Sequence, residues 1–459
     1  MIKPSPSWTA PREGHDWIDN DVLVAVHWLK SFVTPKDWAK REAATLEFFL
    51  TARGRWAQGE TTPLFDLRDK MAWYVFQAET YAKGREYWEP NTTARVVPHL
   101  KKIGKELDVL KSVGGVDARV ARAMTSGRAD PDASIFELLV ALAYKRNGWE
   151  AVEFVPEQPG IARTHDIDVR RNRSRWAVEC KWMRKAAYLE NQKPKVHEMA
   201  RLLQVAALER NVSAIVEVDF RTEIDELPTD YLRTQFMRFR GNTPHVWEDE
   251  YTRGMIRLVD WRLARQVFAS DYVYAESSRY IELLTGVFDE ESEYEVFSKW
   301  RPAKDKPFFA DQIYQAVVVR WRTSSETAQS WKAKHFKSIV AKANGQFPGD
   351  RPAVVHVGVE ASLSKADEFW RHFMNTFEMR WFDPKVSRLR WVYGNYLAPE
   401  QTTHPNETWA ITETTVPYRV GRHSTAEPLP RHMLLDEESK ARDGVHWDGL
   451  GLRPCDALA

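Results

Sequence analysis

The chain has 459 residues, which is enough for two or three domains, and its formal net charge of +1 provides no overall attraction to nucleic acid. No apolar stretch approaches the roughly 20 residues that span a bilayer, and the first seven residues, Met-Ile-Lys-Pro-Ser-Pro-Ser, lack the apolar segment of a signal peptide. The two cysteines, Cys180 and Cys455, form neither a zinc ligand set nor a disulfide framework. A reducing, cytoplasmic location without membrane contact is therefore expected.

The first part of the chain, residues 17–125, has the apolar spacing of helices. Thr34-Pro35 is typical of a helix cap followed by proline in the first turn. Gly114-Gly115 breaks the pattern, and Pro98 is expected at a helix start or at a kink. The sequence thus predicts an all-helical N-terminal domain over residues 1–125. Such a domain could recognise substrate, bind a partner or dimerise.

The next segment, residues 126–220, predicts six elements in a fixed order. A helix over 132–147 is stopped by Gly148 and followed by a strand over 149–155. Residues 164–182 predict two short strands joined by a polar turn. A helix from Pro194 to about Arg210 and a strand over 213–220 complete the order helix, strand, strand, strand, helix, strand.

The hairpin at 164–182 brings acids together. If its turn centres on Asn172 and Arg173, paired residues have numbers that sum to 345, so Asp166 faces Glu179 and Asp168 faces Ala177. Side chains alternate along a strand, so Glu179 and Lys181 share one face. Opposed carboxylates repel each other, and a Mg²⁺ ion, which prefers oxygen ligands and keeps several waters, would relieve the repulsion. Lys181 could then orient or help deprotonate a water and stabilise charge on a phosphate.

These residues in this order of elements resemble the core of the PD-(D/E)xK nuclease superfamily, the restriction-endonuclease-like fold. The resemblance covers about residues 130–220. It implies an α/β protein with an αβββαβ core and a mixed sheet, in which Asp166 and Glu179 bind metal and Lys181 serves the attacking water. It also matches Glu137 to a glutamate that many members carry on the first helix.

The resemblance leaves the choice of aspartate open. The family often has proline before its aspartate, where this chain has His165. A subset, the Mrr-like enzymes, carries Ile-Asp-Val at this point, which would select Asp168, whereas the pairing across the hairpin favours Asp166. The expected ligands of Mg²⁺, or of Mn²⁺ in its place, are therefore Asp166, Glu179, Cys180 and Asp168.

Basic residues surround the expected site. Residues 163–185 contain eight lysines or arginines and three acids, and a basic rim suits a polyanionic substrate. A charged hairpin edge that blocks aggregation explains the same residues. A helix over 325–343 is rich in lysine, with a solvated face as the alternative. The candidate nucleic-acid contacts on the hairpin and on this helix are Arg170, Arg171, Arg173, Arg175, Lys334 and Lys337.

The rest of the chain is expected to form an α+β extension over 221–402 and a β-containing segment with an irregular tail over 403–459. Strands are predicted at 313–322, 352–359 and 409–420, and the first two are expected either to extend the central sheet or to build a second layer. The acidic run over 289–295 is expected to be a solvated loop rather than a second metal site.

The sequence therefore predicts a Mg²⁺-dependent nuclease. The preferred substrate is DNA, and the enzyme is expected to be an endonuclease. Its expected setting is bacterial or phage defence, restriction or DNA processing. A homodimer is expected from the resemblance alone. The alternative is a catalytically silent nucleic-acid-binding or scaffold protein that keeps the fold.

Overall fold

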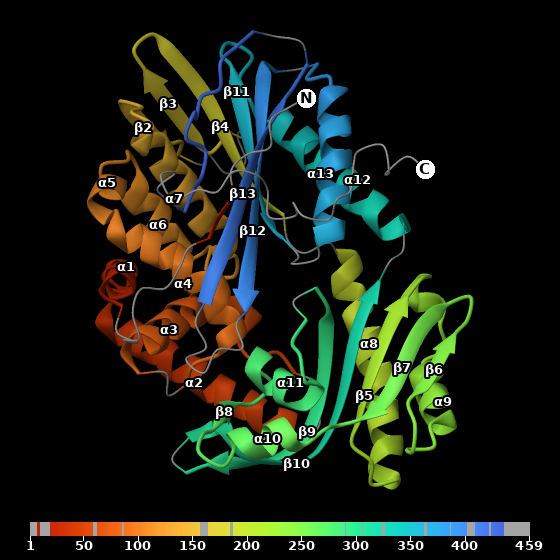
Figure 1. Ribbon diagram of the computed structural model, residues 1–459. Coiled ribbons are helices and arrows are strands. Elements are labelled where there is room, and N and C mark those ends of the chain that lie inside the picture. The colour runs from red at the N-terminus through yellow and green to blue at the C-terminus, as the bar shows by residue number, and fades with distance from the viewer. Residues whose placement is uncertain are drawn as a thin grey trace.

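A computed structural model of the chain shows an N-terminal helical region and two mixed β-sheets (Figure 1). Within the described part of the chain, no helix combines the length and the apolar composition that a membrane crossing needs. The structure describes residues 7–9, 19–57, 62–84, 87–156, 164–183, 187–289, 291–304, 306–323, 326–361, 365–385, 387–401, 409–421 and 424–435.

The helical region confirms the helices predicted over residues 17–125, but the prediction of an all-helical segment over residues 1–125 is wrong at Ser7–Thr9, which form a strand of the first sheet. Pro98 lies inside a helix rather than at its start. Two of the helices cross so closely that a Cβ at Gly104 would meet the backbone oxygen of Asp21 at 1.7 Å. The helices are α1 (Asn20–Lys30), α2 (Pro35–Ala57), α3 (Lys70–Lys83), α4 (Pro90–Lys105), α5 (Leu107–Lys111) and α6 (Val116–Met124), with a 3-10 turn at Leu67–Asp69.

Among the described residues, the first sheet has seven strands and contains the predicted hairpin. Its central strand β11 (Ala353–Glu360) is parallel to β4 (Ser174–Met183) on one side and to β12 (Leu389–Gln401) on the other. Helix α7 (Pro131–Arg146) packs against β4 on one face, and α12 (Glu326–Asn344) and α13 (Lys365–Arg380) pack on the other. The remaining strands are β1 (Ser7–Thr9), β13 (Trp409–Arg419), β3 (Ile167–Arg171) and β2 (Ala151–Phe154).

The expectation of one sheet shared by all the strands of residues 126–220 is wrong. The strand after the hairpin, β5 (Ala214–Phe220), lies in the second sheet, and β11 takes the place beside β4. The connecting helix α8 (Ala187–Glu209) has 23 residues and starts before Pro194. At about 1.5 Å per residue it carries the chain roughly 35 Å, away from the first sheet (Figure 1). Strand β11 is buried along almost its whole length, as befits a central parallel strand.

The second sheet is built around the parallel pair β5 and β10 (Lys306–Thr323). Its other strands are β6 (His245–Glu248), β7 (Thr252–Leu258), β8 (Val273–Tyr274) and β9 (Glu293–Ala303). The apolar side of α8 packs on one face of this sheet. The other helices are α9 (Tyr231–Arg238), α10 (Arg262–Val267), α11 (Ser278–Thr285) and a 3-10 turn at Ile224–Glu226.

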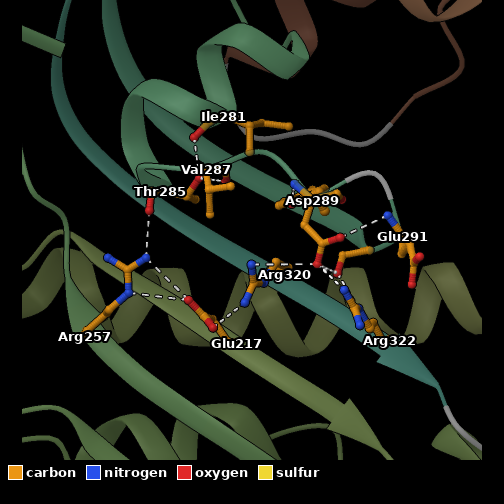
Figure 2. A network of polar contacts seen from close by, with 11 residues as sticks. Glu217, Arg257, Ile281, Thr285, Val287, Asp289, Glu291, Arg320 and Arg322 are labelled. Carbon is orange, nitrogen blue, oxygen red and sulfur yellow. Dashed lines mark hydrogen bonds and ion pairs between the residues drawn. The ribbon is translucent and has the colours of Figure 1, made fainter. Parts of the chain in front are cut away.

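In the acidic run over 289–295, Asp289 forms ion pairs with arginines of β10. Figure 2 shows Asp289 beside Arg322 and Arg320, with Arg320 also paired to Glu217. From Glu293 onward the run belongs to strand β9, so the expectation of a solvated loop is wrong for its second half.

The C-terminal segment packs onto the first sheet. The strand predicted at 409–420 is confirmed as β13, which pairs with β12. Of the expected irregular tail, the structure describes residues 424–435, which contain no helix or strand but contribute Leu429 and Met433 to the core. The buried carboxylate of Glu413 accepts the backbone N–H groups of Leu434 and Leu435 at 2.7 and 2.8 Å and holds this segment in place.

Candidate active site

The hairpin has the predicted register. Strand β3 pairs with β4 so that Ile167 faces Val178 and Asp168 faces Ala177, and Asn172 occupies the turn with a φ of 53°. Asp166 precedes β3 by one residue, and its N–H donates to the carbonyl of Val178 at 3.1 Å. The ladder thus continues one step past the strand and leaves Asp166 beside Glu179.

Two side chains of β4 point toward the α12 face of the sheet. Their neighbours Ala177 and Met183 pack into the core cluster that includes residues of α12. Val178 and Cys180, which alternate with them, belong to the cluster on the α7 side. Glu179 is fully buried and Lys181 is partly buried, and the Lys181 ammonium is paired with Glu179 Oε1. The strand therefore places an acid and a lysine together under the α12 layer.

Asp166 lies at the centre of the acidic cluster. Its Oδ2 accepts the backbone N–H of Cys180 at 2.9 Å, and its Oδ1 accepts from Arg119 Nη2 at 2.7 Å. Arg119 Nε donates in turn to Glu137 of α7. The structure thus links Glu137 to Asp166 through Arg119, which the sequence prediction lacks, and places Asp166 opposite Glu179, whose carboxylate pairs with Lys181.

A signal for Arg119 exists in the sequence. Helix α6 buries Val116, Val120 and Ala123, and this spacing places Arg119 on the same apolar face. A buried arginine is rare without an acidic partner. Recognising α6 as an amphipathic helix would therefore have indicated a carboxylate nearby, although not which one.

Burial and mutual repulsion raise the pKa values of two of the acids. Burial and the charge of Asp166 raise the pKa of Glu179 to about 8, against the opposing effect of Lys181. Burial and the same Asp166 charge raise the pKa of Glu137 to about 7. Burial lowers the pKa of Lys181, but the Glu179 carboxylate outweighs it and the net shift is upward. Perturbed pKa values in one cluster are typical of functional sites.

The oxygen atoms near Glu179 suit a metal ion that is held by few protein ligands and several waters, not one held by many side chains. Among the described residues, no group of three or more His, Cys, Asp or Glu side chains stands close enough together to hold an ion. Glu179 Oε2, however, is buried without a hydrogen-bond partner, and the ladder places Asp166 opposite Glu179. Burial raises the pKa of the Cys180 thiol, so the donor this residue offers is its backbone carbonyl. Two carboxylates and a carbonyl suit Mg²⁺, which keeps several waters.

Asp168 lies in a different environment. Its carboxylate accepts from Arg175 at 2.6 Å and from Arg351 at 3.0 Å, and His165 Nε2 is 3.0 Å from its Oδ1. Burial would raise its pKa, but the hydrogen bonds from His165 and Arg175 and the charge of Arg351 outweigh burial and lower it to about 2. With two arginines on its oxygens, Asp168 is less suited to hold a metal than Asp166.

The predicted nucleic-acid contacts fall into three groups. Arg170, Arg173 and Arg175 are exposed on the hairpin. Arg171 is folded back, with its guanidinium 4.9 Å from the Trp149 ring centroid and a hydrogen bond to the carbonyl of Asn147. Lys337 pairs with Glu378 at 2.6 Å, and the side chain of Lys334 lies outside the described residues.

Comparison with protein-family models, with curated proteins and with solved structures gives no match for this chain.

Proposed function

We propose that this chain is a metal-dependent nuclease that hydrolyses phosphodiester bonds, with DNA as the preferred substrate and Mg²⁺ or Mn²⁺ as the cofactor. The observation that carries the proposal is the placement of Asp166 beside Glu179, with Lys181 on the same face and one buried Glu179 oxygen left without a partner. A buried carboxylate oxygen without a hydrogen-bond partner costs free energy, and a bound cation would remove that cost.

The proposal extends to the fold. Helix α7, strands β2, β3 and β4, and the pair α12 and β11 supply the order αβββαβ when the second sheet is treated as an insertion between β4 and α12. On this reading the chain is a restriction-endonuclease-like protein whose fourth core strand is β11. The parallel pairing of β11 with β4 supports this assignment. It places Val355 beside Glu179 and Val357 beside Lys181, so β11 adjoins the part of β4 that carries the proposed site.

Each residue has a defined part in the proposed reaction. Asp166 and Glu179 would hold the ion with the Cys180 carbonyl, and the ion would polarise the scissile phosphate and acidify a bound water. The upward pKa shift of Lys181 keeps it protonated. It would therefore act as a cation that orients the water and stabilises charge on the phosphate, more than as a base. The exposed arginines of the hairpin would contact the phosphate backbone.

A cleavage assay tests the proposal. Supercoiled plasmid, linear duplex, single-stranded DNA and RNA are incubated with the full chain and with Mg²⁺, Mn²⁺ or EDTA. Wild type is compared with Glu179→Ala, Lys181→Ala and the control Lys193→Ala, whose lysine pairs with Glu293 in the second sheet. We expect metal-dependent cleavage that both site variants lose and the control keeps. Cleavage unaffected in the site variants would sink the proposal.

The alternative is a silent nucleic-acid-binding or scaffold protein that keeps the same fold. The observation in its favour is that Arg119 and Lys181 already pair with the acids of the site, as fixed cations do in a structural cluster. This alternative predicts nucleic-acid affinity that needs no metal and survives Lys181→Ala. Metal-dependent cleavage by wild type would exclude it.

A further inference from the structure

A guanidinium bridges the two acids on one side of the candidate site. Arg119 Nε donates to Glu137, and Arg119 Nη2 donates to Asp166 at 2.7 Å. Asp166 thus meets Glu137 through Arg119, and in the continued β3–β4 ladder it lies opposite Glu179. A second divalent ion in this site would have to share Asp166 with the first and take Glu137 as its other ligand. Arg119 occupies that place.

Arg119 is held firmly. It is 7% exposed, and its guanidinium carbon lies 5.5 Å from the Phe154 ring centroid. Just before helix α6, the N–H of Gly114 donates to Val152 of β2 at 2.9 Å, and its carbonyl accepts from Phe154 at 2.8 Å. Gly115 has a φ of 74°, where a side chain would be strained. The glycine pair, expected only to end a helix, thus fixes α6 to the edge of the sheet and aims Arg119 at the acids.

The charges agree with a single ion. Three carboxylates stand against Arg119 and Lys181, which leaves a formal charge of −1 when all are ionised, and the charge of Arg122, which also acts on Glu137, reduces this excess further. One divalent cation already over-compensates that charge, and a second would add repulsion from the first ion and from the fixed guanidinium.

We propose that Arg119 is a built-in substitute for a second metal ion, so that the site takes one divalent ion, on the Asp166–Glu179 side, while Glu137 positions Arg119 and does not bind metal. This inference rests on the proposed function and specifies how many ions the site takes. It also changes the role expected for Glu137, from a residue near the metal to a residue that anchors a cation.

Ion counting on the full chain without nucleic acid tests the inference. Bound Mn²⁺ is counted from the loss of the free-ion resonance signal. Wild type is expected to bind one ion, and Arg119→Met two, because Glu137 and Asp166 then face each other without a cation. The double variant Arg119→Met/Glu137→Gln should return to one ion. Arg257→Met, which removes the arginine of the Arg257–Glu217 pair in the second sheet, serves as the control and should bind one.

The outcomes separate the inference from the proposed function. One ion in Arg119→Met, or two ions in wild type, overturns the inference and leaves the nuclease proposal standing. Loss of the ion in Glu137→Gln alone, a variant that keeps Arg119, overturns it as well, and this arm remains if Arg119→Met does not fold. Failure of every variant, wild type included, to bind Mn²⁺ at millimolar concentration overturns the proposed metal site and the inference together.

Discussion

A cluster of charged side chains surrounds Asp166 in the first sheet and another surrounds Asp289 in the second, and the two clusters are balanced in opposite ways. In the first sheet, three acids face two cations in a buried setting, and the pKa values of Glu137 and Glu179 are raised. In the second sheet, Glu217 and Asp289 face three arginines (Figure 2). Burial would raise the pKa of Asp289, but hydrogen bonds from Ser292 and Arg322 lower it.

This difference separates a candidate site from a structural network. Every charge in the second cluster has a partner of opposite sign, so the ionised state is the stable one and no further ligand is called for. In the first cluster, three acids pair directly with two cations, Arg119 and Lys181, although the charge of Arg122 also acts on Glu137, and a buried oxygen of Glu179 has no partner. An excess of buried charge destabilises the fold, and it is retained where a ligand or a reaction uses it.

The largest expected effect is on cleavage, and it should differ between two aspartates at the start of β3. Asp166→Asn should lower metal-dependent cleavage by about 100-fold or more, because it removes a proposed ligand of the ion. Asp168→Asn should change cleavage only a few-fold but lower stability, because Arg175 and Arg351 lose their shared partner. Initial rates and urea unfolding of both variants check this. Equal losses of cleavage in the two variants would contradict the distinction between them.

The next effect is a pH dependence of stability. The pKa of Glu179 is about 8 in the folded chain against an ordinary value of 4.5, so between these values the folded state holds the extra proton. Stability should therefore fall as pH rises from about 5 to 8, on the order of 3 kcal/mol relative to Glu179→Gln, which does not titrate. Urea unfolding without metal at pH 5, 6.5 and 8 measures it. Parallel pH profiles for the two proteins would show that Glu179 is ionised throughout.

A smaller effect is expected in the second sheet. Arg320 pairs with Glu217 and lies 3.8 Å from Asp289, with its side chain 23% exposed. Arg320→Met should lower stability by about 1–2 kcal/mol, because it leaves two partly buried acids with one partner fewer each. Cleavage and Mn²⁺ binding should stay unchanged. A loss of metal binding in this variant would mean that the second cluster is not merely structural.

Local patterns account for what the sequence predicts correctly. The register of the β3–β4 hairpin follows from its two-residue turn at Asn172, and that register alone places Asp166 beside Glu179. Helix α7 ends at Asn147-Gly148, as the glycine indicates. Each of these features depends on residues within about 15 positions of one another.

Contacts between distant segments account for what it misses. The parallel neighbour of β4 is β11, which begins about 180 residues later in the sequence. Strands β5 and β11 are both short apolar segments, so the sequence alone does not indicate which of them pairs with β4. The partners Arg119 of Asp166 and Arg351 of Asp168 come from α6 and from the residues before β11. Pairings of this kind are set by topology, which a single sequence does not display.

The smallest expected effect completes the comparison within the second cluster. Arg322 pairs with Asp289, but its side chain is 48% exposed, and Asp289 also accepts from the Ser292 hydroxyl and the Glu291 N–H. Arg322→Gln should therefore cost only about 0.5 kcal/mol, less than Arg320→Met, and the cost should shrink further at high salt because solvent screens the pair. Urea unfolding of both variants at 0.05 and 1 M NaCl decides the point. A larger loss of stability for Arg322→Gln than for Arg320→Met would mean that the network depends mainly on compensating the charge of Asp289, near the end of β10, and not that of Glu217.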